Sequence, residues 1–136
     1  MKELTIEATV ENIEIVTDFV NEQLEAFDCP MKVQIQIDIA IDELFGNIAH
    51  YAYNPEIGQA TVRVEVIEEP LSVVITFIDN GVPYDPLSKT DPDTTLSAEE
   101  RDIGGLGIYV VKKSMDEITY EYKDGHNILK IKKNLN

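Results

Sequence analysis

The spacing of apolar residues predicts a strand and then a helix at the start of the chain. Over residues 2–10, Leu4, Ile6 and Ala8 alternate with polar residues, which is typical of a strand with one buried face. Over residues 13–27, apolar residues recur at intervals of three and four, the pattern of an amphipathic helix: Ile13, Val16, Val20, Leu24 and Phe27. Pro30 ends this helix, because the residue before a proline avoids helical backbone angles.

Residues 31–41 fit two patterns at once. An apolar residue stands at every odd position, which period-two counting assigns to a strand. Helical spacing is also present and continues beyond the segment: Val33, Ile37, Ile41, Leu44 and Ile48. Periodicity alone leaves both alternatives open. The helical alternative runs over about residues 31–53 and stops at Asn54-Pro55.

The rest of the chain predicts two hairpins, separated by a long loop and a short helix. Alternating strands are expected over residues 59–67 and 71–78, and again over 117–123 and 127–133. Residues 82–102 hold three prolines and six acidic residues, and a loop of this length in a compact domain usually has a function. The element order predicts one α+β domain over residues 1–136, with helices on one face of a mixed, mostly antiparallel sheet.

Composition excludes several classes of function. The chain has 136 residues, with 26 acidic residues against 11 lysines and arginines and a formal net charge of −15. This charge argues against nonspecific binding to nucleic acid or to an anionic membrane. Cys29 is the only cysteine, so no internal disulfide is expected. Because neither a signal-peptide pattern nor an apolar run of about 18 residues is present, we expect a cytoplasmic protein.

Asp79 stands at the end of an apolar row. Val73, Ile75 and Phe77 share one face of the strand over residues 71–78, and Asp79 is the next position in that alternation. A carboxylate placed there is costly to bury unless another group donates to it. Two interpretations are open. Residues 79–81 form a plain hairpin turn, or Asp79 lies at the floor of a pocket and accepts a hydrogen bond from the exocyclic amine of a ligand such as adenine.

Two further motifs also have a functional and a structural interpretation. The glycines of Gly104-Gly105-Leu106-Gly107 precede a predicted helix, where they let backbone N–H groups approach a phosphate or form a hinge that closes the loop. Glu43 and Asn47 are four residues apart and share one face of a helix. A carboxylate beside an amide oxygen can serve as a general base and hold a hydrated Mg²⁺, or both side chains can be solvated.

Taken in order, these motifs resemble the GHKL ATPase superfamily, the Bergerat-fold proteins that include DNA gyrase B, sensor histidine kinases and MutL. The order is E-x-x-x-N on a helix, D-x-G after a strand, a proline-rich lid, and G-G-x-G-I before a helix. The short chain is most similar to the stand-alone branch, the anti-sigma-factor serine/threonine kinases of the RsbW and SpoIIAB type. The segments that carry this likeness are ELFGNIAHYAY, FIDNGVPYDP and GGLGIYVVKK.

The resemblance implies a fold and a role for individual residues. It implies a two-layer α/β sandwich, favours the helix over residues 31–53, and places an ATP lid over about residues 82–103. Glu43 matches the general base, Asn47 matches the Mg²⁺-binding asparagine, and Asp79 matches the adenine-binding aspartate. The other residues expected to bind the nucleotide are Gly81, Arg101, Gly104, Gly105, Leu106 and Gly107.

The resemblance also implies a function that uses ATP and Mg²⁺. The first hypothesis is a kinase that transfers the γ-phosphate to a serine or threonine of a small, anti-anti-sigma-like regulatory protein. A sigma factor and a homodimer are further partners expected by analogy. The second hypothesis is an ATP-binding switch module that sequesters a protein partner and transfers phosphate slowly or not at all. The third is an acidic interaction domain whose loop over residues 85–93 binds a cation or a basic peptide.

Overall fold

The sheet has five strands in the order β1-β2-β3-β5-β4. In this computed structural model, which describes residues 1–53, 56–88 and 103–135, the strands are β1 Lys2–Glu7, β2 Gln59–Glu68, β3 Leu71–Asp79, β4 Glu117–Lys123 and β5 His126–Asn134. All strand pairs within these residues are antiparallel. This sharpens the expectation of a mixed, mostly antiparallel sheet, and β2–β3 and β4–β5 are the two expected hairpins.

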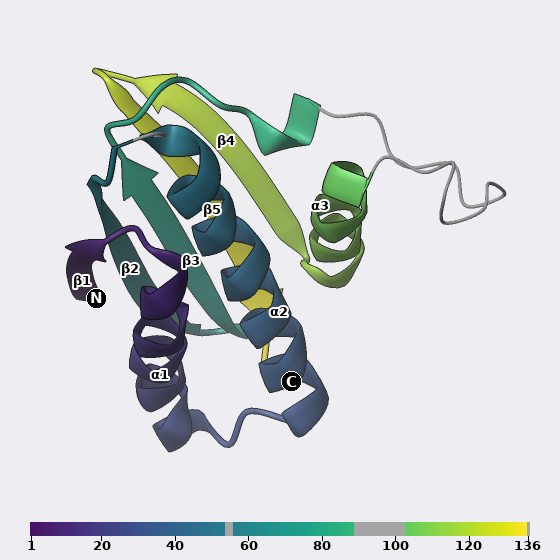
Figure 1. Cartoon of the computed structure of the whole chain (residues 1–136). Coiled ribbons are helices and arrows are strands. Elements are labelled where there is room, and N and C mark those ends of the chain that lie inside the picture. The colour runs from purple at the N-terminus through teal and green to yellow at the C-terminus, as the bar shows by residue number, and fades with distance from the viewer. Residues whose placement is uncertain (54–55, 89–102, 136) are drawn as a thin grey trace, which may run out of the picture.

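Three helices pack on one face of this sheet, which confirms the predicted α+β sandwich (Figure 1). They are α1 Ile13–Leu24, α2 Met31–Asn47 and α3 Ile103–Ser114. Helix α2 lies between the other two and contacts both. Short 3₁₀ turns occupy Val10–Asn12, Glu25–Phe27 and Pro86–Ser88, and none of the helices in the described part of the chain is long and apolar enough to cross a membrane.

Helix α2 resolves the ambiguity of residues 31–41 in favour of the helix. Ile37 and Ile41 are fully buried, whereas Ile35 is 51% exposed and Ile39 is 44% exposed. A strand would have placed all four isoleucines on one face. The helix continues past Asn47 as a π-helical turn over Ile48–Ala52, close to the limit of residue 53 that the resemblance implied.

The core lies between the helices and the inward positions of β2, β3 and β5. Val62, Phe77 and Leu129 lie in one cross-strand row of the sheet, and all three are buried. Two residues further along β3, the register places Asp79 opposite Asn127. A pair of buried polar side chains therefore continues the apolar rows at this end of the sheet.

Helix α3 begins earlier than the sequence indicated. It starts at Ile103, so Gly104, Gly105 and Gly107 lie within its first turns instead of in a loop before it. The first N–H groups of a helix lack intrahelical partners, so glycines there remain compatible with phosphate binding. Gly107 also faces the carboxylate of Glu43 on α2, which a Cβ added at position 107 would displace.

The helical assignment of residues 31–41 predicts different costs for two isoleucine truncations. Ile37→Ala should lower the free energy of unfolding by about 2–5 kcal/mol, because it opens a cavity in the core. Ile39→Ala, the matched control two residues away, should change it by less than about 0.5 kcal/mol, because its side chain is exposed. Urea unfolding of both variants measures this. Equal losses would contradict the helix and favour the strand.

Candidate functional site

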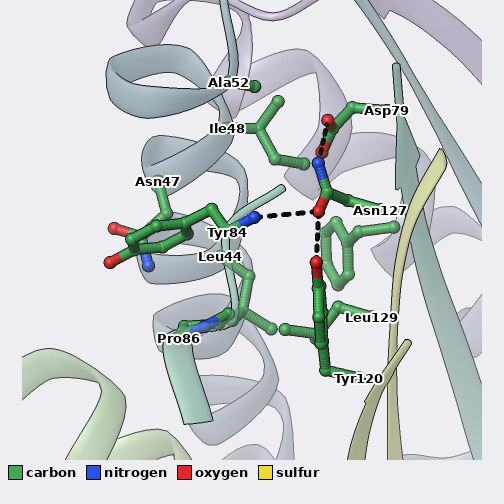
Figure 2. Close-up of a pocket in the computed structure, with 11 residues that line it drawn as sticks. Leu44, Asn47, Ile48, Ala52, Asp79, Tyr84, Pro86, Tyr120, Asn127 and Leu129 are labelled. Atoms are coloured by element: carbon green, nitrogen blue, oxygen red, sulfur yellow. Dashed lines mark hydrogen bonds between the residues drawn. The ribbon is translucent and has the colours of Figure 1, made fainter. Parts of the chain in front are cut away.

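A narrow pocket opens between helix α2 and the sheet, where β3 ends (Figure 2). Its cavity has a volume of about 30 Å³. The apolar walls are formed by Leu44, Ile48, Phe77 and Leu129. Asp79, Asn127 and Asn47 also line it, so polar groups from two strands and one helix converge on one apolar cavity.

Asp79 is buried at this pocket, with only 5% of its surface exposed. Its Oδ1 accepts two hydrogen bonds, from the backbone N–H of Gly81 and from Nδ2 of Asn127, both at 2.9 Å. Burial raises the pKa of the Asp79 carboxyl group, and these two hydrogen bonds and His126 oppose the rise. Residues 82–88 do not form a strand, so the plain hairpin turn is wrong and the pocket interpretation of Asp79 fits the geometry.

Asn127 is the residue of this pocket that the sequence analysis missed. Its Nδ2 donates to Asp79 Oδ1 and to the carbonyl of Val82, both at 2.9 Å. Its Oδ1 accepts from the Tyr84 backbone N–H at 3.1 Å and from the Tyr120 hydroxyl. These four bonds use both donors and both lone pairs of the amide. The signal was present, because Asn127 alternates with buried Leu129 and Ile131, as Asp79 does with Phe77.

Tyr84 lines the pocket, and the sequence analysis gave no role to it or to Tyr51 and Tyr53. The ring of Tyr84 stacks on the ring of Tyr51, with centroids 5.1 Å apart. The hydroxyl of Tyr53 donates to the carbonyl of Gln59 at 2.7 Å and accepts from the N–H of Asn80 at 2.8 Å. These rings lie at helix ends and in loops, where no periodic pattern marks a buried face.

Gly81 follows β3 and packs closely against Ala52 in the π-helical turn at the end of α2. A Cβ at this position would lie 2.2 Å from the carbonyl oxygen of Ala52. The same carbonyl accepts a hydrogen bond from the N–H of Val82 at 2.9 Å. A glycine is therefore required at position 81, because a side chain would collide with the backbone of Ala52.

Glu43, Asn47 and Gly107 come together where α2 meets α3. The Nδ2 of Asn47 donates to Oε1 of Glu43 at 3.4 Å, and the carboxylate packs against the backbone of Gly107. Both side chains are half-buried, so neither is the fully solvated residue of the structural interpretation. Asn47 also lines the pocket that contains Asp79, and α2 therefore connects the two groups of residues.

The remaining predicted site residues divide into two groups. Gly104, Gly105 and Leu106 lie in the first turn of α3. Arg101 and most of the expected lid, residues 89–102, fall outside the described residues, and their expected roles stay predictions.

Comparisons with known proteins show which family the chain resembles in sequence. Residues 6–133 match the model of the histidine kinase-like ATPase domain. The chain is 26% identical over 98 residues to the serine/threonine-protein kinase BtrW of Bordetella bronchiseptica, covering 72% of this chain and 68% of that protein. It is 33% identical over 98 residues to the serine-protein kinase RsbW of Bacillus cereus, covering 69% of this chain and 60% of that protein.

The family match covers nearly all of the described sheet and all three described helices. The alignment with RsbW covers 60% of the length of RsbW. The pocket floor at Asp79 and the contact between α2 and α3 both lie inside the matched residues. The chain belongs to the histidine kinase-like ATPase domain family.

Proposed function

We propose that the chain is an ATP-dependent serine/threonine protein kinase that acts on a small regulatory protein. The observation that carries this proposal is the arrangement along α2, which joins a pocket with a buried carboxylate to a second carboxylate held against α3. The names of the relatives, serine- and serine/threonine-protein kinases, support the same activity.

Asp79 is suited to recognise adenine. Its Oδ1 already accepts two hydrogen bonds, so the exocyclic amine of adenine would donate a hydrogen bond to Oδ2. Guanine presents an oxo group at the equivalent position, and two acceptors would then face each other. Tyr84 and Pro86 line the same pocket, beside the position that the base would take.

The phosphates would lie at the first turn of α3. The N–H groups of that turn and the helix dipole favour an anion, and the glycines there admit close approach. The donor chemistry of Asn47 fits Mg²⁺, because its amide turns Nδ2 towards Glu43 and leaves the amide oxygen as a ligand. When bound, Mg²⁺ would offset the charge of the phosphate oxygens, which matters in a chain of net charge −15.

Glu43 would act as the general base. Its carboxylate is fixed from two sides, by Asn47 on its own helix and by the backbone of Gly107 on α3. A carboxylate in this position could accept the proton of a serine or threonine hydroxyl as that oxygen attacks the γ-phosphorus. The contribution of the chain is otherwise mostly positioning, as expected for phosphoryl transfer.

Adenine recognition predicts a nucleotide-dependent rise in the melting temperature. Mg-ATP at about 100 times its dissociation constant should stabilise the protein by about 2.7 kcal/mol, a shift of several degrees at this size. GTP should give no shift, and Asp79→Asn should abolish the ATP shift. Asp42→Asn, the same change at an exposed position of α2, is the matched control and should keep it. Equal shifts with ATP and GTP would contradict the role of Asp79.

Burial of the Asp79 carboxyl group predicts that the stability of the protein depends on pH, and the Asp79→Asn variant isolates this contribution. The raised pKa means that the folded protein holds this proton to higher pH than the unfolded chain does. The Asp79 contribution to stability is therefore greatest below the ordinary pKa of aspartate, about 4, and declines as pH rises through the raised value. Without nucleotide, the melting temperature of the wild type minus that of Asp79→Asn should fall as the pH is raised above about 4. A rising difference would show that the carboxylate is stabilised when charged.

The role of Glu43 predicts loss of transfer with retained binding. With labelled ATP and a panel of purified anti-anti-sigma-like proteins, Glu43→Gln should slow phosphate transfer by roughly 10²–10⁴-fold, while the ATP-dependent thermal shift persists. Glu22→Gln, on the exposed face of α1, is the matched control. If the wild type binds ATP but labels none of the panel, the switch-module alternative replaces the kinase.

A further inference from the structure

Asn127 lies between the pocket floor and residues 82–84, the first residues of the expected lid. It is 6% exposed on β5, directly opposite Asp79 in the sheet. Figure 2 shows its amide bound to Asp79 on one side and to the backbone N–H of Tyr84 on the other. The same amide also donates to the carbonyl of Val82. The catalytic and nucleotide-binding roles proposed above make no use of this residue.

We propose that Asn127 is a positioning residue for the nucleobase, which holds the Asp79 carboxylate and the backbone of residues 82–84 together as one unit. This inference rests on the proposed nucleotide-binding function and deepens it, because it assigns base selectivity to a second residue of the site.

The first argument concerns the orientation of the carboxylate. Asp79 Oδ1 receives two hydrogen bonds, and one of them comes from Asn127. If the bond from Asn127 is lost, the N–H of Gly81 is the one donor left among the hydrogen bonds described for Asp79. A single hydrogen bond permits the carboxylate to rotate. Asn127 can restrain Asp79 because it is restrained itself, by the Tyr120 hydroxyl and by the register of β5 on β3.

The second argument concerns the backbone of residues 82–84, whose Tyr84 ring lines the pocket. Val82 is anchored at both of its backbone groups, its carbonyl by Asn127 and its N–H by the carbonyl of Ala52. The N–H of Tyr84 is bound to Asn127 as well. The backbone of Val82 and Tyr84 is thus tied to the same side chain that holds the Asp79 carboxylate, so a shift of the Tyr84 ring need not displace the carboxylate.

Two variants of Asn127 separate these contacts. Asn127→Leu has nearly the same size and removes all four hydrogen bonds. Asn127→Asp keeps an acceptor for Tyr84 and Tyr120, but it loses the donors to Asp79 and Val82. Asn134→Leu, the same change at an exposed position of the same strand, is the matched control. Thermal unfolding and circular dichroism first establish that each variant is folded.

The decisive measurement is the affinity for ADP and for GDP in the presence of Mg²⁺, by calorimetry, combined with hydrogen exchange at the Tyr84 amide. Both Asn127 variants should bind ADP roughly tenfold more weakly than the wild type, with GDP binding unchanged, so that the preference for adenine narrows. In the nucleotide-free protein, Tyr84 exchange should accelerate most in Asn127→Leu. Asn134→Leu should match the wild type in every measurement.

Three results would overturn the inference while leaving the proposed function intact. The first is an ADP affinity of the Asn127 variants within twofold of the wild type. The second is an equal loss of affinity for ADP and GDP, which indicates a purely structural role. The third is tighter ADP binding by the variants, which indicates that the contacts of Asn127 obstruct the pocket. A wild-type protein that binds neither nucleotide would instead contradict the proposed function, and the inference with it.

Discussion

The buried carboxylate of Asp79 is the constraint around which the pocket is organised. A charge in this position would cost several kcal/mol if no group donated to it. The neighbourhood supplies donors from two directions, the backbone at Gly81 and the side chain of Asn127. Each donor imposes a further requirement, because Gly81 must pass tightly beside Ala52 and Asn127 must lie opposite Asp79 in the sheet. The turn after β3 and the register of β5 each supply one of the donors to this carboxylate.

Helix α2 contributes both to the pocket that contains Asp79 and to the hydrophobic core. Its inner face, with Ile37 and Ile41, is fully buried against the sheet, and its C-terminal half carries Glu43 and Asn47. A side chain on a helix that is fixed by the core is positioned more accurately than one on a loop. The π-helical turn at the end of α2 then presents the carbonyl of Ala52 to Val82. The same helix thus contributes to the core and to both ends of the proposed nucleotide site.

The sequence predicted the elements whose patterns are local and left open those that depend on packing. Strands and hairpins followed from alternation, and Asp79 was found because it interrupts an apolar row. The helix over residues 31–53 could not be derived from periodicity, since its isoleucines satisfy two periods, and it needed the family resemblance. The start of α3 was placed too late, because glycine is a poor helix former and the contact of Gly107 with Glu43 is not local. Asn127 was overlooked although its alternation matches that of Asp79.

The position of β5 has a consequence for the order in which the site can form during synthesis. β5 is the last strand along the described residues, yet it lies inside the sheet, between β3 and the edge strand β4. A chain that emerges from its N-terminus can form the β2–β3 hairpin and its helices early, with Asp79 still lacking its partner across the sheet. The pocket is completed only when Asn127 has been made and β5 has inserted beside β3. A nascent chain would therefore hold Asp79 without its partner for the time that it takes to make the 48 residues that lead from Asp79 to Asn127.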